Sequence, residues 1–403
     1  MGAKYGEKQC TGSIRRPLAP SASQVSDHTI SYGFLSSSSP TPCGIATFTA
    51  ALGATLVDMG AKVSVVRVLD APSEYPSVGL PVVSELVAAD PTSIDRAIEA
   101  LNRSDVAVVQ HEYGLYGGRD GADVVKVIYG LRVPSIAILH TVLSTPTTHQ
   151  REVLNDVIHG VDVVVVMSET AASTLRRVNE INGTLVMIIP HGAAVRNSSR
   201  VRARGARPRL LTWGLIGPGK GIEWAIDAMS LLRDLDPAPL YIVAGRTHPK
   251  VLARQGDIYR ESLVQRVDRL NLRDMVHFDN SYRSLPSLNE LIHSADLVVL
   301  PYDSHDQATS GVLVDALAAG LPVVATAFPH ARELLASGAG SVVAHEDAPA
   351  LAKALRSILT LPELLDDMAS EARSIASSLS WTTVASQYQR AANALLQSVV
   401  VGA

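Results

Sequence analysis

A glycine-rich segment in the second half of the chain has the composition of an anion-binding loop. It spans 214–221, GLIGPGKG, between a predicted strand and a predicted helix. Backbone N–H groups around Gly219, the helix N-terminus and the ammonium group of Lys220 are the groups that hold phosphate in many proteins. Because Gly221 and not Ser or Thr follows the lysine, the P-loop spacing is not met. The sequence therefore predicts a phosphate site of another kind.

A second polar loop, 301–311 with the sequence PYDSHDQATSG, also follows a predicted strand. Thr309, Ser310 and Gly311 lie where the next helix begins, so their N–H groups are candidates to bind a diphosphate. Asp315 lies one turn further, where a carboxylate could accept hydrogen bonds from ribose hydroxyls. It could equally be a first-turn acid favoured by the helix dipole.

The first half contains its own polar loop, 110–118 with the sequence QHEYGLYGG, directly after a strand. His111, Glu112 and Tyr113 combine aromatic and acidic side chains beside glycines. Aromatic rings stack on the C–H faces of a sugar and carboxylates bind its hydroxyls, so this loop is a candidate acceptor site. A structural role for the same residues stays open.

Three further residues follow first-half strands or precede a helix. His140 caps an apolar strand at its carboxyl end, although a lone histidine is more often a core residue than a catalytic one. Gly44 precedes a helix, where it exposes N–H groups to a ligand or serves as an ordinary loop glycine. His191, in IPHG, again follows a strand. Since no G-x-G-x-x-G occurs at these points, dinucleotide binding is not indicated.

The elements that must position these residues alternate between short apolar strands and amphipathic helices. Near-continuous apolar strands between helices indicate parallel sheets covered on both faces. We expect strands at 30–34, 63–68, 106–110, 135–139, 163–167, 186–189, 210–213, 240–244, 276–278, 297–300 and 323–325. We expect helices at 45–59, 93–102, 122–129, 150–158, 169–178, 222–232, 259–270, 288–294, 312–319, 348–359, 362–375 and 382–399.

A polar stretch interrupts this pattern near the middle and divides the chain. We expect a flexible leader at 1–27, an N-terminal acceptor-side Rossmann-like domain at 28–195, a linker at 196–209, a C-terminal donor-nucleotide-binding Rossmann-like domain at 210–380, and a helix crossing back to the first domain at 381–403. The linker arginines could alternatively hold an acidic partner. If the two domains face each other, their strand-end loops line one cleft.

Composition excludes several classes of protein. The 403 residues carry a net charge of −4, which does not suit a dedicated nucleic-acid binder. Two cysteines exclude a disulfide framework and a cysteine-based zinc site, and they favour the cytoplasm. We expect no metal and no cofactor. Residues 1–27 lack the apolar core of a signal peptide. Peripheral membrane contact stays open, although no helix has the lysine-rich amphipathic face that would support it.

The whole set of segments resembles the family-4 glycosyltransferases of the GT-B fold. The strongest segment is SGVLVDALAAGLPVVAT at 310–326, followed by the Lys-Gly loop at 214–223. CGIATFT at 43–49 and THP at 247–249 resemble a bacterial branch often taken to be mannosyltransferases. The resemblance covers nearly all of the chain after the leader and implies an α/β fold of two doubly wound domains facing each other across a cleft.

The resemblance also implies roles at matching positions. Lys220 matches the lysine that contacts the donor diphosphate, and Gly44 matches a glycine loop over the same group. Asp315 matches the second acid of a Glu-x₇-Glu motif, which holds the donor ribose. Gln307 stands where the first acid contacts the transferred sugar. His140 matches a histidine that lies against that sugar.

Two positions depart from the family pattern. Leu215 stands where an arginine is usual, five residues before the lysine, and Arg246 in the GRTHP loop is the candidate substitute. Gln307 is uncharged, which leaves the donor sugar open. The activity implied is transfer of a hexose, mannose first, from a nucleotide-diphosphate sugar such as GDP-mannose to a carbohydrate or glycoconjugate hydroxyl, with retention and without metal. Rivals are a non-catalytic sugar-nucleotide-binding protein, an epimerase and a phosphorylase.

Overall fold

The computed structural model describes residues 29–41, 43–72, 78–88, 90–181, 183–195, 206–281 and 283–402, with the side chains of 399–402 excluded. The expected leader at 1–27 lies outside the described residues, as does most of the expected linker. Among the described residues, no helix has both the length and the apolar character needed to cross a bilayer.

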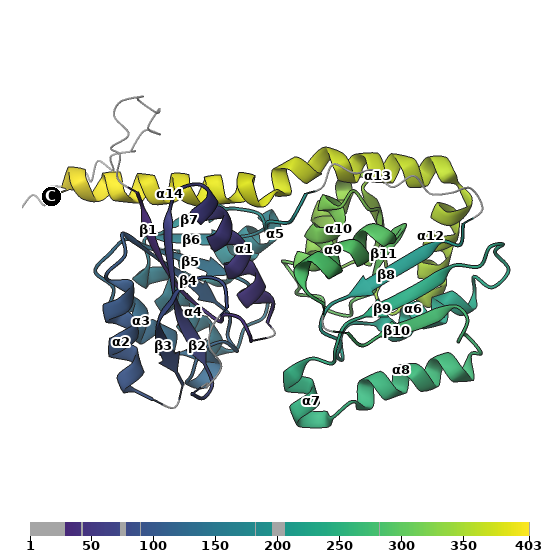
Figure 1. The fold of residues 1–403 in the computed structure, drawn as a ribbon, viewed down its shortest axis with the longest axis horizontal. Coiled ribbons are helices and arrows are strands. Elements are labelled where there is room, and N and C mark those ends of the chain that lie inside the picture. The colour runs from purple at the N-terminus through teal and green to yellow at the C-terminus, as the bar shows by residue number, and fades with distance from the viewer. Residues whose placement is uncertain are drawn as a thin grey trace, which may run out of the picture.

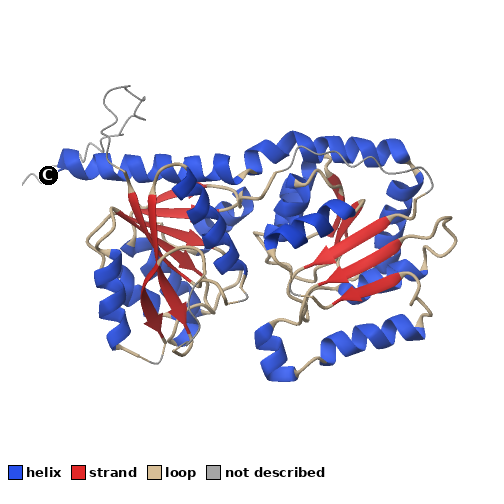
Figure 2. Cartoon of the chain, viewed as in Figure 1, coloured by secondary structure: helices blue, strands red, loops and turns tan. Residues whose placement is uncertain are grey.

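The first domain is built on a seven-stranded sheet with the order β3-β2-β1-β4-β5-β6-β7, in which every adjacent pair is parallel (Figures 1 and 2). Its central strands consist almost entirely of buried Val, Ile, Leu and Ala, as expected for a sheet covered on both faces. The strands are β1 (Ser31–Ser36), β2 (Lys62–Leu69), β3 (Val82–Val87), β4 (Val106–His111), β5 (Ser135–Leu139), β6 (Val163–Val166) and β7 (Leu185–Ile188).

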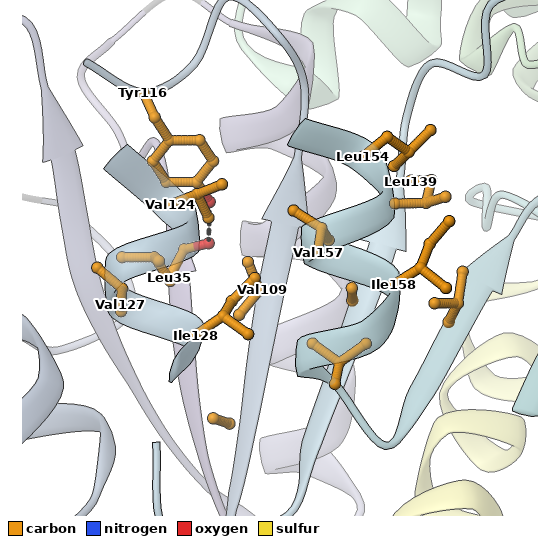
Figure 3. Close-up of a cluster of buried hydrophobic side chains, with 14 of the residues drawn as sticks. Leu35, Val109, Tyr116, Val124, Val127, Ile128, Leu139, Leu154, Val157 and Ile158 are labelled. Carbon is orange, nitrogen blue, oxygen red and sulfur yellow. Dashed lines mark hydrogen bonds between the residues drawn. The ribbon is translucent and has the colours of Figure 1, made fainter. Parts of the chain in front are cut away.

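Helices cover both faces of this sheet. They are α1 (Gly44–Asp58), α2 (Thr92–Leu101), α3 (Asp123–Tyr129), α4 (Thr148–Gly160) and α5 (Glu169–Val178), with a 3₁₀ turn at Arg119–Gly121. Figure 3 shows α3 and α4 placing Val124, Ile128 and Val157 over the sheet. In the same cluster the Tyr116 hydroxyl donates to the Leu35 carbonyl, 3.5 Å away. Tyr116 thereby fixes the loop that follows β4 to the end of β1.

The second domain contains a six-stranded parallel sheet with the order β10-β9-β8-β11-β12-β13. Its strands are β8 (Arg209–Trp213), β9 (Leu240–Ala244), β10 (Val276–Asp279), β11 (Leu297–Leu300), β12 (Val323–Thr326) and β13 (Gly340–Val343). Its helices are α6 (Ile222–Ser230), α7 (Pro249–Gln255), α8 (Ile258–Arg269), α9 (Leu285–Ser294), α10 (Gly311–Ala318), α11 (Pro329–Leu334), α12 (Ala348–Thr360) and α13 (Pro362–Ala376), with 3₁₀ turns at Leu335–Ser337 and Ser377–Leu379.

The last helix, α14 (Trp381–Gly402), returns to the first domain and runs along it beside α1 (Figure 1). Val384, Ala385 and Tyr388 are buried in the same apolar cluster as Phe34 and Phe48 of the first domain. Trp381 packs edge-on against Phe48 with the ring centroids 5.2 Å apart. The first domain's core is therefore completed by the end of the chain.

Both sheets reverse their strand order at one point, and this determines where ligands can bind. In the first sheet the reversal lies between β1 and β4, and in the second between β8 and β11. In open parallel sheets, ligands bind outside the carboxyl ends of the strands at such a switch point. The loops that follow β4, β8 and β11 carry most of the candidate residues from the sequence.

The structure adds elements that the sequence pattern did not predict. Strands β3 and β13 are edge strands, and each lacks the continuous apolar run by which the central strands were found. Helix α7 buries no side chain, so it has no apolar stripe, and α11 has only six residues. Strand β8 begins at Arg209, one residue inside the expected linker.

Candidate active site

Contacts between the domains bring their strand-end loops together. The Ser168 hydroxyl, after β6, donates to the carbonyl of Ala308 at 2.7 Å. Ser144, after β5, hydrogen-bonds the carboxylate of Asp306. The Lys250 ammonium group donates to the carbonyl of Gly114 at 2.9 Å. The loops after β4, β5 and β6 thus meet the loop after β11 and helix α7, which follows β9.

The glycine-rich loop after β8 takes a conformation that requires glycine. Gly221 has φ +60°, and a Cβ atom there would lie 1.7 Å from the carbonyl oxygen of Pro301. Gly219 has φ +86° and open space around it. Its carbonyl accepts the Asp303 N–H at 3.0 Å, which joins this loop to the one after β11. An anion could therefore approach the backbone at Gly219.

Lys220 lies between these two loops. Its ammonium nitrogen is 4.2 Å from the centroid of the Tyr302 ring, a cation–π contact, and within the described residues it makes no ion pair. The side chain has an aromatic partner that the sequence did not reveal. The buried Tyr302 ring thus holds the Lys220 ammonium group beside the loop that follows β11.

The N-terminus of α10 is only partly free for a ligand. The Ser310 N–H donates to Nδ1 of His330 at 2.8 Å, and the Ser310 hydroxyl caps the helix by accepting the Leu313 N–H at 3.3 Å. The Ser310 N–H is thus bonded within the protein, and its expected contact with a diphosphate stays a prediction. Gly311 provides the next N–H group.

The other second-domain candidates lie around this helix start. Burial raises the pKa of Asp315 to about 7, and its carboxylate has no hydrogen-bond partner in the described part of the chain. The Gln307 amide donates to the carbonyl of Thr309 at 3.3 Å, and the Gln307 carbonyl accepts the His330 N–H. Arg246 is exposed in the loop after β9.

His140 lies at the end of β5 with its ring held from two sides. Its Nε2 donates to the Gln110 side-chain oxygen at 2.6 Å, and Phe48 of α1 packs edge-on with the ring centroids 5.1 Å apart. Burial, aided by His191 and His111, lowers the pKa of His140 to about 3. The imidazole is therefore neutral at physiological pH.

The loop after β4 contains the three acceptor-side candidates, largely buried. Burial lowers the pKa of His111 to about 4, and its Nδ1 has no hydrogen-bond partner among the described residues. Glu112 accepts hydrogen bonds from the Thr141 hydroxyl and from the Tyr113 N–H, while burial raises its pKa. Tyr113 packs edge-on against His111, and its hydroxyl is also buried without a partner in the described chain.

A cluster of rings connects the helix starts of both domains. Phe48, one turn inside α1 from Gly44, contacts both His140 and His191. His191 lies against Gly311 so closely that a Cβ atom there would be 2.9 Å from its Nε2. His191 was not among the predicted site residues. Its place after a strand at the domain exit was the signal that could have found it.

Gly44 is the first residue of α1 and has nothing within 4 Å of the position that a Cβ atom would take. Space for a ligand therefore exists above this helix start. Among the described residues, no three His, Cys, Asp or Glu side chains gather as a group that could hold a metal.

The second half of the chain matches a known family. Residues 196–375 match the family described as Glycosyl transferases group 1. A stretch of 204 residues is 29% identical to D-inositol 3-phosphate glycosyltransferase from Streptomyces griseus subsp. griseus. That match covers 48% of this chain and 42% of the relative, so it spans less than half the length of either protein.

Solved structures share the whole architecture. Sucrose-phosphate synthase from Thermosynechococcus elongatus superimposes with a TM-score of 0.73 at 18% identity, covering 92% of this chain and 100% of that one. Anabaena Alr3699/HepE, solved in complex with UDP and glucose, gives 0.73 at 18% identity and covers 91% and 100%. The chain thus has the α/β GT-B fold, and its residues 196–375 match the glycosyl transferases group 1 family.

Proposed function

We propose that this chain is a glycosyltransferase that moves a hexose from a nucleotide-diphosphate sugar to a hydroxyl of a carbohydrate or glycoconjugate acceptor. The observation that carries the proposal is the cluster of Phe48, His140 and His191, which joins the open start of α1 to the start of α10 across the domain boundary. Lys220 lies on the adjoining loop. The family match of residues 196–375 supports the same reaction class.

Different residues would bind different parts of the donor. Lys220, the backbone at Gly219 and Gly311, and the start of α1 at Gly44 would hold the diphosphate, with Arg246 as a second cation and Thr309 beside it. Preorganised N–H groups and cations stabilise a leaving group without any rearrangement at the moment of reaction. Asp315 would accept hydrogen bonds from the ribose.

The transferred sugar would lie between Gln307 and His140, and the acceptor would lie near His111, Glu112 and Tyr113. The acceptor hydroxyl oxygen bonds to the anomeric carbon as the carbon–oxygen bond to the diphosphate breaks. Its proton passes to a diphosphate oxygen, so no protein base is required. We propose that the hydroxyl attacks on the face that the diphosphate leaves, which retains the configuration, and that no metal ion is needed, as the resemblance to family-4 glycosyltransferases implies.

The donor is proposed only as a class. Alr3699/HepE binds UDP, which makes UDP-sugars candidates beside GDP-mannose, our first choice. The acceptor would be a carbohydrate or a glycoconjugate. A cytoplasmic location stays a prediction, and contact with a membrane stays open.

The test is an assay of nucleotide release from GDP-mannose, UDP-glucose and ADP-glucose, with and without a chelator. We expect one donor to be consumed at a rate that the chelator does not change. Without an added acceptor the sugar passes to water, and NMR recorded before the released sugar mutarotates should show the donor's anomeric configuration retained. Loss of activity with the chelator would contradict metal independence, and an inverted product would contradict retention.

A non-catalytic sugar-nucleotide-binding protein is the second candidate. It is favoured by Gln307, whose amide bonds to the backbone of its own loop and carries no charge. Binding of a nucleotide-sugar without any release of the nucleotide, across all three donors, would support this candidate and exclude the transferase.

A further inference from the structure

The side chain of Gln110 is buried directly behind His140. Gln110 lies at the end of β4 with 0% of its surface exposed, and its side-chain oxygen accepts a hydrogen bond from His140 Nε2 at 2.6 Å. Its amide nitrogen has no partner in the described chain. Within the described residues, the contact with His140 is therefore the one hydrogen bond that this buried side chain makes.

This contact determines which nitrogen of His140 carries the proton. A carbonyl oxygen can only accept, so Nε2 must be the N–H donor. The neutral ring then has a lone pair on Nδ1. Nδ1 has no hydrogen-bond partner among the described residues, and the ring is only half-buried. His140 thus presents an acceptor and not a donor at its free edge.

The backbone of Gln110 is fixed as well. Its carbonyl accepts the Tyr116 hydroxyl at 2.5 Å, and Tyr116 is itself packed in the core of the first domain. In the pairing of β4 with β5, Gln110 lies beside Ile138, and Ile138 is two residues before His140. The backbone of Gln110 is thereby held on a rigid element, and burial of the side chain keeps the amide beside His140.

We propose that Gln110 is a positioning residue that holds His140 in the neutral Nε2–H form, so that Nδ1 accepts a hydrogen bond from a hydroxyl of the donor sugar. The inference rests on the proposed transferase function for the sugar, but the state of the His140 ring can be tested without it. A sugar hydroxyl that donates its hydrogen to Nδ1 would direct its oxygen lone pairs away from the imidazole ring.

Among the groups around His140, Gln110 is the one that determines which ring nitrogen carries the proton. His111 on β4 and His191 after β7 face the ring, and burial keeps both neutral by lowering each pKa to about 4. Phe48 on α1 is apolar. The Glu112 carboxylate accepts hydrogen bonds from the Tyr113 N–H and from the hydroxyl of Thr141, the residue after His140.

The direct test is ¹⁵N NMR of the histidine side chains in the full chain, with His140 assigned by the loss of its signals in His140→Asn. We expect a neutral ring with the proton on Nε2 from pH 5.5 to 8. In Gln110→Met, which keeps the volume but has no acceptor oxygen, both neutral forms should appear. A wild-type ring protonated on Nδ1, or charged at pH 6, would overturn the proposal whatever the activity.

The second test uses the consumed donor and the Gln110→Glu variant. A carboxylate at this position should raise the pKa of His140, so kcat should fall as pH decreases from 8 to 6, whereas the wild type stays flat. Gln110→Met should lose roughly tenfold or more in kcat with nucleotide affinity unchanged. Gln265→Glu, an exposed change on α8, is the matched control and should behave as wild type.

The outcomes separate the two proposals. If wild type consumes no donor, the transferase proposal fails while the NMR result still decides the ring form. If wild type is active and Gln110→Met keeps full kcat, or Gln110→Glu keeps a flat pH profile, the positioning role is overturned. Circular dichroism melting of both variants shows whether any loss is only a loss of folding.

Discussion

The two sides of the domain interface differ in the kind of group they present. The second-domain side presents Lys220 over the Tyr302 ring, glycine-lined backbone and the start of α10. The first-domain side presents His140 and His191, which burial keeps neutral. The second-domain side therefore supplies the cation, while the first-domain side supplies neutral rings and, at Gly44, the start of a helix.

This difference suggests that the second-domain side binds the diphosphate and that the first-domain side binds the sugar. A diphosphate carries its charge at the end that leaves, and a cation with backbone N–H groups is the arrangement that stabilises it. A sugar is uncharged, and neutral polar groups suit its hydroxyls without the cost of burying an unpaired ion. The comparison predicts that variants on the two sides fail in different ways.

Lys220→Ala is the change expected to have the largest effect. Removing the main cation should lower turnover by roughly 10²- to 10³-fold, as loss of one preorganised group does in other enzymes. Stability should change by no more than about 1 kcal/mol, the scale of one cation–π contact. Steady-state kinetics and thermal melting measure the two effects, with the exposed Lys353→Ala as the control. Equal losses in both variants would contradict the assignment.

Asp315→Asn tests the second-domain carboxylate through pH. Because burial raises the pKa of Asp315 to about 7, well above its value in the unfolded chain, the native state keeps the proton over that interval. Its contribution to stability is therefore present at pH 4 and lost as pH rises through 7. The asparagine variant should be more stable than wild type at pH 8 by roughly 2 kcal/mol and equal to it near pH 4.

The same variant should bind the nucleotide-sugar less tightly, because an amide is a weaker acceptor for ribose hydroxyls than a carboxylate. Melting curves at both pH values and titration of the donor separate the two effects. A variant that is no more stable at pH 8 than at pH 4, relative to wild type, would show that the carboxylate is not desolvated as the structure indicates.

Gly311→Ala tests the contact between the two sides. The added methyl group would lie 2.9 Å from His191 Nε2, so the domains must separate or the ring must move. We expect kcat/KM to fall by about tenfold, or about 1.4 kcal/mol. In a double-mutant cycle with His191→Ala, most of the loss in kcat/KM caused by Gly311→Ala should disappear. Strictly additive losses would mean that the two residues do not meet in the active form.

Glu333→Gln should have the smallest effect. The Glu333 carboxylate in α11 accepts two N–H groups, of Glu169 and Thr170, each at 2.9 Å, at the start of α5 in the other domain. Losing this charge from a helix N-terminus should cost about 1 kcal/mol of stability and raise the donor KM slightly. Glu363→Gln, in the first turn of α13, is the control, because Glu363 has no such contact among the described residues. An identical shift in the control would exclude an interdomain role.

The fold was predictable because its central strands are continuous apolar runs. Val163–Val166 and Leu297–Leu300 are fully buried and were found from composition alone. The edge strands were not, because Val82–Val87 has only its last two residues buried. A periodic pattern of apolar residues indicates which side chains are buried. An edge strand, or a surface helix such as α7, is largely exposed and therefore lacks such a pattern.

The site was predictable only as a set of loops. Glycines and polar residues after strands pointed to Lys220 and His140, but the partners that fix them, Tyr302 and Gln110, are far away in sequence. The occupied N–H of Ser310 could not be foreseen, since His330 comes from a helix too short to show a pattern. Tertiary contacts of this kind exist only once both sheets are folded.

Nucleotide binding by three forms of the full chain tests this difference between the two sides most directly. A ligand that binds only the folded state raises the melting temperature by mass action. We predict that UDP, GDP or ADP raises the melting temperature of the wild type and of His140→Ala alike, and that Lys220→Ala loses most of the shift. Loss of the shift in His140→Ala, or its full retention in Lys220→Ala, would contradict the account.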